Sequence, residues 1–240
     1  ITGLEASLPT AFRLSASGSA ENPTDMKRLM ADIKLSARTF DLGFVTGLLD
    51  PSVMASYRIP SGIALDGRVR ADRQHYTADL TAREGSGRVK LSGTFDAAAM
   101  AYKARVGIDN LNLHHFMPKD SLYGVTCSLD LDGRGTDMLA RTTRLDAAAK
   151  VTAFRYGSFD ISGVDATVRI RDGVGHAAID SRNDLLYGTI VADALMDTRR
   201  VQATVSTDLS KADLYRLRVM DRPFEAAMCA HVDIASNLKD

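Results

Sequence analysis

The chain has 240 residues, of which 45% are hydrophobic and 25% charged, so it is long enough to bury a core as one large or two ordinary domains. Its 30 Lys and Arg residues balance 30 Asp and Glu residues, which leaves no excess charge to attract nucleic acid or anionic lipid headgroups. No apolar run reaches the roughly 20 residues that a membrane-spanning helix needs, and the N-terminus lacks the pattern of a secretion signal.

Alternation of apolar and polar residues predicts most of the elements, because successive side chains of a β-strand point to opposite faces. In one such segment, Leu65 and Val69 alternate with Asp66, Arg68 and Arg70. The pattern predicts strands, in chain order, over residues 63–70, 88–95, 102–108, 125–132, 164–170, 187–191, 201–205 and 228–234. Arg and Lys recur on the polar side, which is expected where that side faces water. The sequence therefore predicts a sheet with one apolar and one polar face.

Short turn signals separate the strands. They include Glu84-Gly85-Ser86-Gly87, Arg171-Asp172-Gly173 and the segment from Asp197 to Arg200. Such turns are typical of hairpins between antiparallel neighbours. The spacing leaves no room for a helix after each strand, so parallel strand–helix–strand units are not expected. We expect a long antiparallel sheet.

Three segments interrupt the alternation, near residues 41–60, 110–123 and 208–223. Each carries apolar residues at helical spacing, such as Leu113, Phe116 and Met117 in the second, and each precedes a new strand. We interpret them as crossovers, formed by short helices or loops, that repeat at intervals of about 70 and about 100 residues. The whole chain, residues 1–240, is then a single elongated segment, and we expect it to belong to a larger protein.

No motif for catalysis or for metal binding stands out. Cys127 and Cys229 form no Cys-x-x-Cys or Cys/His cluster, and no two of the five histidines have the helical spacing of metal ligands. Asp130-Leu131-Asp132-Gly133 lacks the later ligands of a calcium loop, and no complete nucleotide-binding glycine motif occurs. Asp130 and Asp132 are expected on the polar face, where water keeps carboxylates ionised. We therefore expect no enzyme activity and no cofactor.

The second crossover and its flanking strands carry a likeness to a known family. Residues 110–137 combine Asn-Leu-Asn-Leu, Phe-Met-Pro, Leu-Tyr-Gly and Leu-Asp-Leu-Asp-Gly-Arg-Gly-Thr-Asp. This stretch resembles the large AsmA-like envelope proteins, in particular the TamB group, and residues 41–67 and 207–237 look like weaker copies. The resemblance implies an antiparallel sheet bent into a half-pipe, or β-taco, whose concave face is apolar.

The resemblance also implies a function and a place in the cell. In that family the chain is anchored in the inner membrane of a Gram-negative bacterium and crosses the periplasm towards an Omp85-family outer-membrane barrel. The implied role is non-catalytic: transfer of phospholipid acyl chains along the groove, assistance to outer-membrane protein assembly, or both. No nucleic acid partner is expected.

The side chains expected to line the groove lie on the apolar face of the predicted strands. They are Leu65, Val69, Leu80, Val89, Leu91, Phe95, Val106, Leu129, Leu131, Val168 and Val205. An apolar face must be covered by something, either by lipid or by another part of the protein. The alternative is therefore a closed β-sandwich, with these residues as its core, that binds protein or glycan at the cell envelope.

Overall fold

The computed structural model describes residues 3–8, 10–40, 58, 60–197, 200–217, 221–223 and 225–237. Fifteen strands and one short 3-10 helix make up the regular structure of these residues. They are β1 (Leu4–Leu8), β2 (Phe12–Glu21), β3 (Met30–Thr39), β4 (Ala64–Asp72), β5 (His75–Glu84), β6 (Gly87–Asp96), β7 (Ala101–Asn112), η1 (Leu113–His115), β8 (Leu122–Arg134), β9 (Arg144–Tyr156), β10 (Phe159–Ile161), β11 (Val164–Arg171), β12 (Val174–Arg182), β13 (Leu186–Asp197), β14 (Arg200–Asp213) and β15 (Glu225–Asn237).

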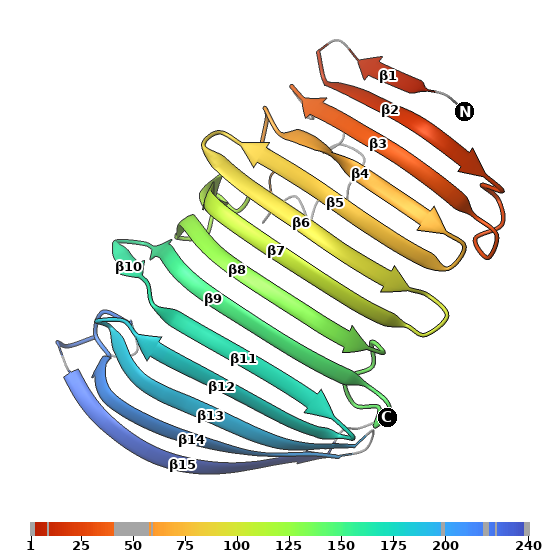
Figure 1. Cartoon of the computed structure of the whole chain (residues 1–240). Helices are drawn as coiled ribbons and strands as arrows, with labels where there is room; N and C mark the ends of the chain where they lie inside the picture. The colour runs from red at the N-terminus through yellow and green to blue at the C-terminus, as the bar shows by residue number, and fades with distance from the viewer. Residues whose placement is uncertain are drawn as a thin grey trace.

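All of these strands belong to one antiparallel sheet, and each pairs with its neighbours along the chain. The short β10 lies off this path and pairs with the end of β9. Figure 1 shows a long, twisted sheet with β1 at one end and β15 at the other. The prediction of a mostly β, antiparallel fold is confirmed. The closed sandwich is wrong for the described residues, because their strands form one open sheet with no second sheet against it.

The turns follow from local backbone chemistry. Asp172 and Gly173, with φ angles of 53° and 79°, form the two-residue link between β11 and β12. Positive φ at both positions is typical of the tight hairpin turn that matches the twist of its strands, and Asp-Gly is a preferred sequence there. Gly85 likewise has a positive φ, of 55°, in the turn between β5 and β6. Two turns predicted from the sequence are therefore present.

The three described strands that precede residue 40 join the same sheet. Strands β1, β2 and β3 pair in sequence, and β3 pairs with β4 so that Leu35 lies opposite Gly67. The link from β3 to β4 includes residues 41–57 and 59, so the first predicted crossover lies almost entirely outside the described residues.

The other two crossovers are shorter than predicted. Residues 110–112 belong to β7, and 208–213 belong to β14. In the second crossover the helical spacing gives only the three-residue η1, where the amides of Phe116 and Met117 both donate to the Leu113 carbonyl. Pro118 follows and has no amide hydrogen to continue this pattern. In the third, residues 214–217 form a turn closed by the Leu217 amide on the Asp213 carbonyl, and residues 218–220 lie outside the described residues. No described helix is long and apolar enough to cross a membrane.

Little of the molecule is deeply buried. The buried apolar side chains include Leu111 and Val125, which face each other near one margin of the sheet, and Ile170 and Leu209 near strand ends. The chain exposes 15687 Å², whereas a compact monomer of its mass, 25.9 kDa, exposes about 10,500 Å². An uncovered one-layer sheet contributes to this excess, which is about 5,000 Å² by this scaling.

Candidate functional site

One face of the sheet, called here the apolar face, carries apolar side chains from strand to strand. Its two central rows are set by the pairing register from β3 to β15. One row contains Leu35, Gly67, Leu80, Leu91, Val106, Leu129, Ala149, Ala166, Ile179, Ile190, Thr207 and Ala230. The other contains Ile33, Val69, Ala78, Gly93, Ala104, Leu131, Ala147, Val168, Ala177, Ala192, Val205 and Val232. No charged residue occurs in either row.

The eleven side chains predicted to line a groove all lie on this face. Eight of them occupy the two central rows. Leu65 and Val89 lie in the next row, where both pair with Ala82 of β5. Phe95 lies in the row on the opposite side, next to Tyr76, and the two ring centres are 6.2 Å apart. The register thus brings together residues from strands far apart in the sequence.

Sequence reasoning missed part of the apolar face. Phe12, Leu14 and Ala16 of β2 alternate in the same way and continue it past β3. The small residues Ala147, Ala177 and Ala192 continue it through β9, β12 and β13. Their alternation with polar neighbours is visible in the sequence, but alanine is a weak strand signal because it is also common in helices.

The described structure leaves the apolar face without a second layer. Strands pack only against their neighbours in the sheet, and no member of the two central rows is fully buried. Ile179 and Val232 are 37% and 50% exposed. Side chains on a sheet face that belongs to a protein core are normally covered by a helix or another sheet.

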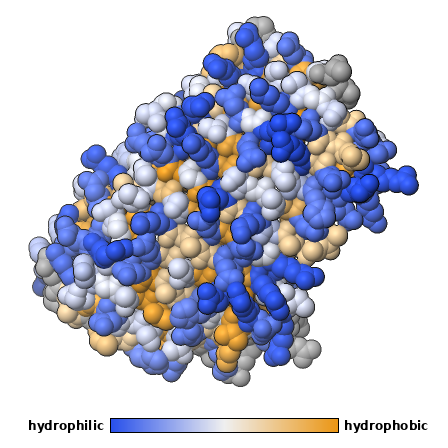
Figure 2. Space-filling view, viewed as in Figure 1, coloured by the Kyte–Doolittle hydropathy of each residue, from blue (hydrophilic) through white to orange (hydrophobic). Residues whose placement is uncertain are grey.

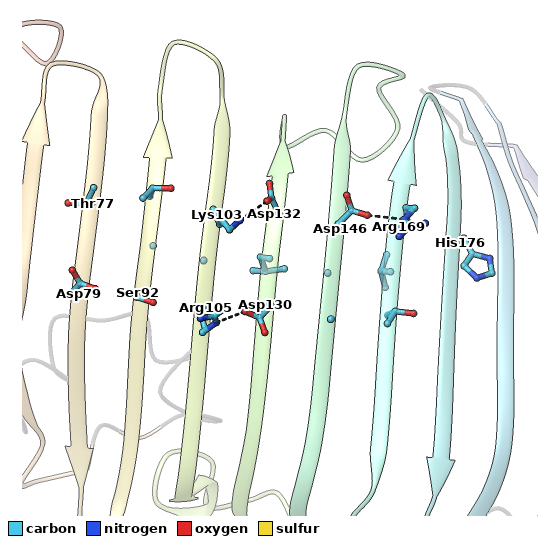
Figure 3. Close-up of a pocket in the computed structure, with 18 of the residues that line it drawn as sticks. Thr77, Asp79, Ser92, Lys103, Arg105, Asp130, Asp132, Asp146, Arg169 and His176 are labelled. Carbon is cyan, nitrogen blue, oxygen red and sulfur yellow. Dashed lines mark hydrogen bonds and ion pairs between the residues drawn. The ribbon is translucent and has the colours of Figure 1, made fainter.

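The opposite face, called here the polar face, carries paired charges. A broad hollow of about 950 Å³ lies over its central strands, and Figure 3 shows the side chains around it. Arg105 of β7 donates to Asp130 of β8 with Nε and Oδ1 2.6 Å apart, and Lys103 lies 3.2 Å from Asp132. Hydrophilic residues predominate on the face seen in Figure 2, with apolar residues visible between them.

These charges neutralise one another across strands. Asp146 of β9 accepts hydrogen bonds from Arg169 and Arg171 of β11, at 2.9 and 2.7 Å. His176 of β12 lies 2.7 Å from Asp193 of β13. Hydrogen bonds from Arg171 and Arg169 lower the pKa of Asp146, so this carboxylate is held in its ionised form. A general acid at neutral pH needs a raised carboxyl pKa, so Asp146 has the opposite character.

The remaining candidate groups are dispersed. Among the described residues, no group of three or more His, Cys, Asp or Glu side chains is placed to hold a metal ion. Cys127 and Cys229 are both free thiols. Cys127 lies on the apolar face opposite Ile108, and burial raises the pKa of its thiol, whereas Cys229 is exposed.

The apolar face is therefore the feature that the fold itself does not explain, and we take it as the candidate site. Comparison with protein-family models, with curated proteins and with solved structures found no match to this chain.

Proposed function

We propose that this chain is a non-catalytic module whose apolar face binds the acyl chains of phospholipids. The observation that carries the proposal is the pair of central rows, which run without a charge from β3 to β15 and keep contact with solvent. An exposed apolar surface of this extent marks a binding site for an apolar partner. A lipid chain suits it because the rows are continuous and carry no charge, and Thr207 is the one polar side chain among them.

The energetics are favourable without any polar contact. Full burial of a methylene group contributes about 0.8 kcal/mol, and a chain lying on a sheet is covered on one side, so about half of this applies. Twelve methylenes then contribute about 5 kcal/mol. This contribution grows with length and depends little on position along the row, which suits movement of the lipid across strands.

We further propose that the sheet acts as a half-pipe with the apolar face inside, in the periplasm of a Gram-negative bacterium. In this proposal the chain is part of an inner-membrane-anchored protein of the TamB or AsmA type. It serves phospholipid transfer or outer-membrane protein assembly beside an Omp85-family partner. A twisted sheet is saddle-shaped, so each face is concave along one diagonal. The hollow over the polar face is thus compatible with a trough on the apolar face.

The test is site-specific photocrosslinking to phospholipid. A photoreactive residue is placed at Leu91 or Leu129 and, as matched controls, at Lys90 or Asp130, which are adjacent on the same strands but belong to the polar face. The protein is mixed with vesicles of phosphatidylethanolamine and phosphatidylglycerol, irradiated and analysed by mass spectrometry. We expect lipid adducts at Leu91 and Leu129 and few at the controls. Equal labelling at all four positions would refute the proposal.

A further inference from the structure

The crossover between β7 and β8 is tied to the turn between β5 and β6, at the same margin of the sheet (Figure 1). His115 Nδ1 lies 2.6 Å from Oε1 of Glu84, the last residue of β5. Asn110 donates from Nδ2 to the Ser86 hydroxyl at 3.0 Å. Glu84 alternates with Leu80 and Ala82 and so belongs to the apolar side of its strand. The crossover is thereby held at the margin of the apolar face.

The orientation of the Asn112 amide is fixed by the backbone. Asn112 precedes η1, and its Oδ1 accepts a hydrogen bond from the His114 amide at 3.2 Å. A reversed amide would place its NH₂ group against that N–H donor. The Nδ2 group must therefore face the other contact of this side chain, His115 Nε2 at 3.0 Å. Nδ2 can only donate, so Nε2 must accept.

These contacts select one form of the imidazole. With Nε2 accepting from Asn112, the ring proton resides on Nδ1 and is donated to the Glu84 carboxylate. The Glu84 side chain is only 10% exposed, whereas that of His115 is 47% exposed. The ring can thus take up a proton from water while its carboxylate partner stays in place.

We propose that Asn112, His115 and Glu84 form a proton-sensitive switch that loosens the start of η1 in mildly acidic solution. Addition of a proton to Nε2 sets an N–H donor against the Nδ2 donor of Asn112, and that hydrogen bond is lost. Asn112 is then free to leave the His114 amide as well. The contact between His115 and Glu84 survives, because Nδ1 remains a donor and the ring that donates now carries a positive charge, which strengthens its hydrogen bond to the carboxylate.

Among the described contacts, Glu84 is the acidic side chain that faces the His115 ring. The neighbouring His114 stacks on Tyr123 of β8, with ring centres 5.0 Å apart, and its Nδ1 lies 3.2 Å from the Asp120 carbonyl. Arg58 reaches the crossover through its backbone amide, which donates to the Phe116 carbonyl. The His114 side chain therefore offers a matched control, since it lies in the same turn but its ring contacts neither Asn112 nor Glu84 in the described structure.

The first test measures directly which nitrogen of the His115 ring carries the proton. Nitrogen-15 shifts of the His115 imidazole in the whole chain at pH 7.5 should show a protonated Nδ1 and a bare Nε2. The reverse pattern would overturn the proposal without any substitution.

The second test measures the hydrogen bond from the His114 amide to Asn112 Oδ1. Hydrogen exchange of the His114 amide, corrected for its intrinsic pH dependence, should show protection that falls about fivefold between pH 7.5 and 5.5, as expected for loss of one hydrogen bond. His115→Gln should abolish this response and His114→Gln should retain it. In Asn112→Asp the introduced carboxylate accepts from the protonated ring, so protection should hold or rise in acid. A fall in Asn112→Asp equal to that of the unsubstituted chain, or an unchanged response in His115→Gln, would refute the switch. Neither test involves lipid, so its outcome is independent of the proposed function.

Discussion

Two strand glycines offer a sharp test of the sheet geometry. A Cβ atom on Gly67 of β4 would lie 2.3 Å from the Asp79 carbonyl oxygen and 2.8 Å from the Leu80 Cα atom. Both are backbone atoms of β5, so relief requires the two strands to separate. A Cβ atom on Gly107 of β7 would meet nothing within 4 Å. Neither glycine has a positive φ, so the substitutions differ in packing and not in backbone strain.

The two substitutions are expected to change the stability of the fold in opposite directions. Overpacking costs about 1–3 kcal/mol, whereas replacing a glycine by alanine stabilises by about 0.5–1 kcal/mol through the unfolded chain. Gly67→Ala should therefore be destabilised by about 1 kcal/mol or more, and Gly107→Ala should be neutral or slightly stabilised. A difference of about 2 kcal/mol corresponds to about 4–8 °C in Tm for a chain of this size.

The assay is thermal and urea unfolding of the two variants and the unsubstituted chain, followed by circular dichroism. The two variants form a matched pair, because each carries a single substitution of glycine by alanine. Gly67→Ala with a midpoint equal to or above that of Gly107→Ala would refute the close approach of β4 and β5.

Two further predictions concern single groups. Pairing with Arg171 and Arg169 lowers the pKa of Asp146, so this pairing stabilises the fold above the ordinary carboxyl pKa of 3.8 and its contribution is lost as the pH falls through the lower pKa of the folded state. Asp146→Asn should therefore reduce the dependence of stability on pH below about pH 4.5, as measured by urea unfolding. An unchanged dependence would contradict this. Cys229 is exposed, whereas burial raises the pKa of the Cys127 thiol. A maleimide reagent at pH 7.5 should therefore label Cys229 in the Cys127→Ser variant faster than it labels Cys127 in the Cys229→Ser variant. Equal rates would contradict the difference in exposure.

Eight of the fifteen described strands (β4, β6, β7, β8, β11, β13, β14 and β15) could be predicted from the sequence, because alternation is a local signal. Val89, Leu91 and Phe95 show which residues share a face without any knowledge of the partners of β6. The crossovers could not be predicted in the same way. Leu113, Phe116 and Met117 have helical spacing, but Asn112 before them pairs with β8 and Pro118 after them has no amide hydrogen, and η1 has only three residues.

The margin contacts also lie beyond sequence patterns. Glu84 and His115 are 31 residues apart, and only the order of β5, β6 and β7 in the sheet brings them together. The hollow over the polar face depends on the bend of many strands at once, so alternation of residues within one strand gives no sign of it. Alternation identifies the candidate face, whereas its exposure became evident only from the absence of a second layer over the described strands.

Pairing between successive strands has a consequence for how such a chain can change in evolution and in engineering. Insertion or removal of one hairpin adds or deletes two adjacent strands, and an even number of strands preserves both the direction of those that follow and the side on which their apolar residues lie. The length of the sheet can thus vary by about 10 Å per hairpin, at two strand spacings of about 4.8 Å, without redesign of the rest. Excision of β5 and β6, whose flanking strands β4 and β7 would then become neighbours, would show whether the sheet tolerates such shortening.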